Sequence, residues 1–267
     1  VTFQGADIQI HENINYGARL NKKYEKFLKT TIKNVDFFTS ISKNISIDLN
    51  QLGIPNNKIF SFPNCVNQSK FDSIFSADRV TDHLTFITVG RFAEKKKGFD
   101  LIKDIVEILN KKKIQFKWKI IGHGVSEILR YNKIKDNLDK FNIIENIENV
   151  DELYFPNRKL IKEYKSSDIY LTLSRVESFG ITFIESLSAE VPIISFDTKG
   201  ANEIIISDHN GFIIKNFNFK DYAEKIEQIY NNRDILKKIK QNSKSSVIKF
   251  DLEYNTKLLT DFYSKIT

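Results

Sequence analysis

From residue 84 onward, short apolar runs rich in β-branched residues alternate with segments whose apolar residues recur at helical spacing. The alternation predicts strands at 84–89, 116–121, 143–147, 169–173 and 192–196, and helices at 100–110, 126–139, 159–166 and 181–189. Such alternation is typical of a parallel sheet with helices on both faces. The expected fold class is therefore α/β, with a doubly wound, Rossmann-like parallel sheet in the C-terminal part.

The first 80 residues predict the second half of another α/β domain. Strands are expected at 1–3, 37–40 and 59–62, and helices at 18–33 and 43–52. The sequence opens on Val1 as if a strand were already under way and contains no Met, so we expect that the beginning of a longer chain is missing. We expect residues 1–75 to be the remainder of an N-terminal domain, 76–245 a C-terminal domain, and 246–267 a C-terminal helix that can pack back on the first domain.

Charge and cysteine content limit the cellular setting and the partners. The 267 residues carry a net charge of +7, with lysine runs at 95–97 and 111–113. Such runs suit nucleic acid, an anionic membrane surface or anionic small substrates, or they are simply solvated loops. No pattern of interleaved aromatic residues supports a nucleic-acid partner. The single cysteine, Cys65, and the lack of a long apolar run predict a cytoplasmic protein, with peripheral contact at the inner face of an anionic membrane as a further option.

Ligands of doubly wound sheets bind at the carboxyl ends of the strands, so the loops after Val89, Ile121 and Leu173 are where a site is expected. The first of these loops contains Arg91 and Lys97. A planar guanidinium and a compact ammonium together suit the oxygens of a diphosphate. The alternative is an ordinary basic surface loop.

The second loop contains Gly122 and Gly124, which would let the backbone turn tightly and approach a ligand. His123 between them has no second His or Cys at ligand spacing, so a surface or turn position is the simpler interpretation. We therefore predict no metal site here.

The third loop contains two carboxylates, Glu177 and Glu185, on either side of a glycine turn. The unpaired amides of a helix that starts after this turn can hold a phosphate, and they lie around Phe179, Gly180, Ile181 and Thr182. Glu185, about one turn deeper, can accept two hydrogen bonds from a vicinal diol such as a ribose. Glu177 can reach beyond the phosphate, or it is only an acid that neutralises the helix dipole.

Residues 84–215 resemble the C-terminal domain of retaining GT-B glycosyltransferases of the glycosyltransferase family 4 type, also called group 1. The resemblance rests on ordered motifs, with Glu177 and Glu185 separated by seven residues as the central one. The others, in order, are Gly90-Arg91, Lys97-Gly98, Gly122-x-Gly124, Pro192-Ile193-Ile194, Gly200-x-x-Glu203 and Asn210-Gly211. Residues 36–71 resemble the end of the family's first domain through Pro63-Asn64-Cys65-Val66.

The resemblance implies a role for each of these residues. Arg91 and Lys97 would bind the donor diphosphate, Glu185 the ribose and Glu177 the transferred sugar, and the amides near Gly180 and Ile181 would bind the distal phosphate. Arg91, Lys97 and Glu177 are then the expected catalytic residues. Gln4 stands where many relatives have a histidine beside the reaction centre, which leaves its role open, and Glu190 replaces the glycine that usually ends the helix.

The expected function is the transfer of a sugar, with retention, from a nucleotide-diphosphate-sugar such as a UDP- or GDP-sugar to a glycan, lipid-linked or protein acceptor in surface polysaccharide or glycoconjugate biosynthesis. No Asp-x-Asp pair occurs, so neither a metal nor another cofactor is expected. Two alternatives remain: a GT-B sugar-nucleotide epimerase, which would need its own acid and base, and a nucleotide-sugar-binding module without turnover.

Overall fold

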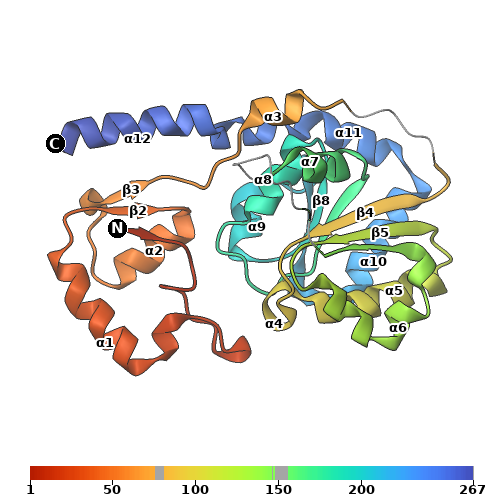
Figure 1. The fold of residues 1–267 in the computed structure, drawn as a ribbon, viewed down its shortest axis with the longest axis horizontal. Helices are drawn as coiled ribbons and strands as arrows, with labels where there is room; N and C mark the ends of the chain where they lie inside the picture. Colours follow the sequence, from red (N-terminus) through yellow and green to blue (C-terminus); the bar gives the residue numbers. More distant parts are fainter. Residues whose placement is uncertain (76–80, 146, 148–155, 267) are drawn as a thin grey trace.

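The chain forms two parallel β-sheets, one small and one large, that lie side by side with helices around them (Figure 1). The structure is a computed structural model, and it describes residues 1–75, 81–145, 147 and 156–266. The small sheet has three strands and the large sheet has six.

The large sheet has the strand order β6-β5-β4-β7-β8-β9 and is parallel throughout. Its strands are β4 (Leu84–Val89), β5 (Phe116–Ile121), β6 (Phe141–Ile144), β7 (Ile169–Thr172), β8 (Ile193–Phe196) and β9 (Gly211–Ile214). From β4 the chain winds outward through β5 and β6, and then it returns to the other side of β4 with β7. The strand order therefore reverses between β4 and β7, and such a switch point leaves a crevice at the carboxyl ends of the two strands.

Alternating side chains of each strand enter two different cores. Phe86 of β4 and Leu171 of β7 pack under α5 (Ile102–Lys111) and α10 (Phe219–Asn231). Ile87 and Tyr170 point to the opposite face, which is covered by α7 (Arg158–Lys165), α8 (Ile181–Ser188) and α9 (Lys199–Ile204). Both faces of the sheet are covered, which explains why the central strands β4, β7 and β8 are buried throughout and mostly apolar. This confirms the predicted doubly wound sheet.

The small sheet has the order β1-β2-β3 and is also parallel. Its strands are β1 (Thr2–Phe3), β2 (Phe38–Ser40) and β3 (Ile59–Ser61), and its helices are α1 (Lys22–Thr31) and α2 (Lys43–Gln51). The predicted helix at 18–33 is wrong as a single element. The Asn21 side chain accepts hydrogen bonds from the amides of Lys23 and Tyr24, and this N-cap starts α1 after a short 3-10 turn.

Five further α-helices lie within the described residues. These are α3 (Gln68–Asp72), α4 (Glu94–Lys97), α6 (Asn132–Lys135), α11 (Asp234–Ser243) and α12 (Leu252–Ile266), where α3, α4 and α6 are short connections. The last of them, α12, returns to the small sheet (Figure 1). There the Phe262 ring stacks on Phe60 with 4.2 Å between ring centroids.

Two predicted elements differ from the structure for identifiable reasons. The helix expected at 126–139 is broken at Tyr131, which is extended. Ile128 and Ile134 are both fully buried, and six positions apart they would lie on different faces of a continuous helix. The strand expected at 143–147 begins earlier, at Phe141, and ends at Ile144 because the Glu145 carboxylate turns back to accept hydrogen bonds from the amides of Gly124 and Ser126; residue 146 lies outside the described residues.

Candidate active site

The loops that leave β4 and β7 meet at the switch point of the large sheet, and their approach requires a glycine. Gly98, at the end of the β4 loop, has φ of 69°, and a Cβ on it would lie 2.0 Å from the carbonyl oxygen of Leu173. The Arg175 amide also donates to the carbonyl of Lys96 at 2.9 Å. The two loops are thus in backbone contact, and this contact brings Lys97 against Glu177.

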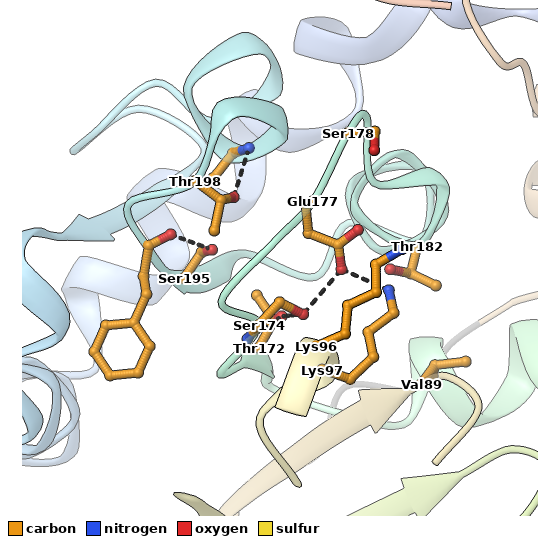
Figure 2. Close-up of polar contacts among 12 residues, drawn as sticks. Val89, Lys96, Lys97, Thr172, Ser174, Glu177, Ser178, Thr182, Ser195 and Thr198 are labelled. Atoms are coloured by element: carbon orange, nitrogen blue, oxygen red, sulfur yellow. Dashed lines mark hydrogen bonds and ion pairs between the residues drawn. The ribbon is translucent and has the colours of Figure 1, made fainter. Parts of the chain in front are cut away.

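Lys97 and Glu177 form an ion pair at the centre of this site (Figure 2). The Lys97 Nζ lies 2.5 Å from the Glu177 Oε1, and the Ser174 hydroxyl donates to the same oxygen at 2.9 Å. Only 7% of the Glu177 side chain is exposed, whereas the Lys97 side chain retains 24% exposure. The ammonium is therefore the more exposed partner, and the carboxylate is largely buried next to it.

Ser174 was not predicted as a site residue. It lies three positions before Glu177, and its hydroxyl holds the carboxylate that pairs with Lys97. The structure thus brings Lys97 and Glu177 into direct contact and adds a serine that orients Glu177.

The turn after Glu177 leads directly into α8. Gly180 has φ of 93°, and a Cβ there would lie 2.5 Å from the Phe183 ring, so a side chain would be strained in this place. No side chain caps the helix, so its first-turn amides, those of Ile181 and Thr182, are open to an anion. Phe179 is buried beneath the turn, where its ring packs edge-on against Phe250.

Glu185 lies one helical turn below this N-terminus and is 2% exposed. The Tyr164 hydroxyl donates to its Oε2 at 2.9 Å and is its one hydrogen-bond donor among the described residues. Burial raises the pKa of Glu185 to about 7, an effect that the Tyr164 hydrogen bond and the nearby Lys97 charge oppose. A buried carboxylate with a single donor can accept further hydrogen bonds from a ligand hydroxyl. Tyr164 was also missed, because a tyrosine inside a helix carries no sequence signal for this contact.

The β5 loop takes part in the site mainly through close packing. Gly122 has φ of 145°, and a Cβ on it would lie 2.1 Å from the carbonyl oxygen of Gly90. The Gly124 amide donates to Glu145 at 2.6 Å. Gly122 therefore lets the β5 loop approach the β4 loop, while the Gly124 amide already has a partner within the protein.

Arg91 follows Gly90 on the same rim and is exposed. No ion pair or hydrogen bond holds its side chain within the part of the chain that the structure describes. Its guanidinium is thus free to turn toward an anion near Lys97.

Within the described ranges, no group of three or more His, Cys, Asp or Glu side chains is placed to hold a metal ion. Likewise, no described helix is both long and apolar enough to cross a membrane.

Comparison with known proteins shows similarity along almost the whole chain. It is 24% identical over 253 residues to the poly(ribitol-phosphate) alpha-N-acetylglucosaminyltransferase of Staphylococcus aureus, covering 94% of this chain and 47% of that protein. It is 26% identical to an uncharacterized glycosyltransferase of Methanocaldococcus jannaschii, covering 95% of this chain and 64% of that protein. The chain thus spans about half to two thirds of the length of these relatives.

Solved structures show the same architecture. The crystal structure of TarM superimposes with a TM-score of 0.74 at 19% identity, covering 97% of this chain and 49% of TarM. A glycosyltransferase from Rickettsia africae gives a TM-score of 0.76 at 22% identity, covering 99% of this chain and 69% of that one. These similarities establish the GT-B fold.

The family model of the glycosyl transferases group 1 matches residues 69–246, which include the β4 loop, the Glu177 turn and α8. The match covers most of the chain and all of the crevice described above. The chain therefore belongs to the glycosyl transferases group 1 family.

Proposed function

We propose that this chain binds a nucleotide-diphosphate-sugar at the switch point and transfers its sugar with retention to a glycan, lipid-linked or protein acceptor. The observation that carries the proposal is the Lys97–Glu177 pair beside the uncapped N-terminus of α8. A similar protein supports the proposal, because the pneumococcal O-GlcNAc transferase GtfA was solved in complex with UDP and GlcNAc. The process we propose is surface polysaccharide or glycoconjugate biosynthesis, in the cytoplasm.

Each donor group would find a complementary protein group. The diphosphate would lie between Lys97, Arg91 and the first-turn amides of α8, all of which carry positive charge or partial charge. The ribose diol would donate to Glu185, whose carboxylate has one protein donor among the described residues. Glu177 would then face the transferred sugar.

This arrangement addresses the main electrostatic problem of the reaction. Cleavage of the sugar–phosphate bond develops negative charge on the leaving diphosphate, and fixed cations and amides stabilise that charge. Lys97 and the Gly180–Thr182 amides are held in position before the donor arrives, so little reorganisation is needed. Metal independence is proposed from these cations and from the lack of an Asp-x-Asp pair, and retention is proposed from the family resemblance.

The acceptor has a candidate place beside the turn of residues 177–180, which we call the donor turn. A cavity of about 590 Å³ lies between residues 10–14 and the segment Arg175–Val176, directly before Glu177, and Phe217 and Phe219 also line it. Burial, with the charge of Lys199 adding to it, lowers the pKa of His11 in this cavity, so its ring is neutral near pH 7 and can accept a hydrogen bond. Aromatic rings and neutral polar groups together suit a saccharide acceptor.

Peripheral contact with an anionic membrane is proposed for α1. Lys22 and Lys26 of α1 and Lys33 of the 3-10 turn after it are exposed, and Phe27 of α1 is 65% exposed. A helix with exposed lysines and an exposed aromatic ring suits an anionic lipid surface. Cosedimentation with phosphatidylglycerol vesicles should fall several-fold when Lys22, Lys26 and Lys33 are all replaced by Gln; equal sedimentation of both proteins would reject the membrane contact.

The direct test is turnover. When UDP-, GDP- and ADP-sugars are offered in turn, the wild type should hydrolyse the donors that carry one of the three bases. Lys97→Ala should reduce this hydrolysis at least about a hundredfold because one fixed cation is lost. Lys112→Ala is the matched control, since Lys112 forms a similar pair with Glu227 at 2.6 Å far from the crevice. Binding without hydrolysis would favour the binding module, and epimerised donor would favour the epimerase. No binding of any sugar nucleotide would reject all three.

A further inference from the structure

Gln9 is a buried amide between the two sheets, with only 3% of the residue exposed. Its Oε1 accepts a hydrogen bond from the Ser178 hydroxyl at 2.6 Å, across the boundary between the small-sheet and large-sheet parts. Its Nε2 donates to Asp48 Oδ2 of α2 at 3.2 Å. The amide oxygen is therefore bonded to the large-sheet part and the amide nitrogen to the small-sheet part.

Ser178 belongs to the donor turn, between Glu177 and the glycine that starts α8. The backbone of the small-sheet part is pressed against it, because a Cβ on Gly5 would lie 2.1 Å from the Ser178 Oγ. On the far side, Asp48 Oδ1 is 3.4 Å from Lys199 Nζ of α9. The chain of contacts thus starts on the donor turn, passes through Gln9 and Asp48, and returns to the large-sheet part.

We propose that Gln9 is a positioning residue that fixes the turn 177–180 against the small-sheet part, an inference that rests on the proposed donor site. Only glutamine combines the required length with an acceptor for Ser178 and a donor for Asp48. A glutamate would place a second carboxylate against Asp48, and a methionine of similar volume would make neither hydrogen bond. Fixing Ser178 orients the neighbouring Glu177.

This role separates binding from turnover. The nucleotide contacts groups of the large-sheet part, namely the α8 amides, Lys97 and Glu185, so loss of Gln9 leaves its affinity nearly unchanged. Transfer depends on the orientation of Glu177 relative to the sugar, and small misplacements of a reacting group are costly. Loss of Gln9 therefore lowers kcat.

A second glutamine–serine pair provides a matched control. Gln68 Nε2 donates to the Ser188 hydroxyl at 2.9 Å, at the opposite end of α8 from the donor turn. The experiment compares Gln9→Met and Ser178→Ala with Gln68→Met and Ser188→Ala. The readouts are UDP affinity by calorimetry, donor hydrolysis, thermal unfolding, and hydrogen exchange of the amides of residues 177–179.

We expect Gln9→Met and Ser178→Ala each to lower kcat about tenfold, with the UDP Kd changed by less than about twofold and no further loss in the double variant. The amides of 177–179 should exchange faster in these two variants and not in the controls. Unchanged exchange and kcat, or equal losses in both pairs that follow the unfolding midpoint, would overturn the role of Gln9. If the wild type turns over no sugar nucleotide, the proposed function fails, and the exchange comparison still decides whether Gln9 positions the turn.

Discussion

The two carboxylates of the site differ in how many hydrogen-bond donors and cations the protein places next to them. Glu177 has both a cation and a hydroxyl within hydrogen-bonding distance, whereas Glu185 has one tyrosine hydroxyl among the described residues. The protein thus supplies a cation for Glu177, whereas Glu185 keeps hydrogen-bonding capacity that a ligand can use. Such a site lowers the stability of the unliganded protein in exchange for ligand binding.

Glu185 should make stability depend on pH. Its folded pKa of about 7 lies above the ordinary value of 4.5, so the folded state holds the proton more tightly. The contribution is fully present below pH 4.5, falls as pH rises toward 7, and amounts to on the order of 3 kcal/mol. Glu185→Gln, which mimics the protonated acid, should remove this slope and raise stability at pH 7.5 while weakening nucleotide binding.

Urea unfolding at pH 5.0 and 7.5 measures this difference. Comparing wild type with Glu185→Gln isolates the one group, because the other titrating residues are common to both proteins. Parallel pH profiles for the two proteins would show that Glu185 is ionised at both pH values and that its burial has little effect.

At the scale of elements, the strands were the most predictable part. β4 lies at the residues that its apolar run predicted, because every residue of a strand buried on both faces contributes to the apolar signal. β5 also lies where it was predicted, although Lys117 is exposed and Lys119 is half-buried, so its apolar residues alternate with lysines before Ile120. The broken helix at Tyr131 and the early end of β6 were not predictable, since both depend on tertiary contacts of Ile134 and Glu145. Glu190, just after the end of α8, has φ of 61°, a left-handed conformation that glycine would adopt more easily.

Contact between the β4 and β7 loops can be tested through two glycines. Gly98 and Gly53 both have positive φ, but a Cβ on Gly98 would meet the Leu173 carbonyl at 2.0 Å, whereas nothing lies within 4 Å of one on Gly53. Gly53→Ala should cost only the backbone strain, about 1 kcal/mol of unfolding free energy. Gly98→Ala should cost at least about 3 kcal/mol, because the loops must separate.

Chemical denaturation of the two variants beside wild type gives both values. Equal losses would mean that the loops adjust freely and that the packing at the switch point is not fixed. A Gly98→Ala variant that also loses nucleotide binding, while Gly53→Ala keeps it, would connect this packing to the site.

For the whole molecule, the two sheets are joined by several polar contacts around the donor turn. Tyr16 accepts a hydrogen bond from the Lys96 ammonium at 2.9 Å, and the Glu203 carboxylate accepts from the Lys43 amide at the start of α2 at 2.7 Å. These pairs are separated by 80 and 160 positions in the sequence. Sequence patterns predicted the motifs that we propose to bind the donor, because these motifs are local. They gave no indication of which small-sheet residues would contact them.

Lys97, at the switch point between β4 and β7, is the residue that we propose to bind the phosphates of a nucleotide. The decisive measurement is titration calorimetry of UDP and GDP with wild type, Lys97→Ala and the control Lys112→Ala. We expect at least one nucleotide to bind wild type and Lys112→Ala, with affinity at least about tenfold weaker in Lys97→Ala because a charge-assisted contact is lost. Equal nucleotide affinity in all three proteins would show that Lys97 does not bind the phosphates.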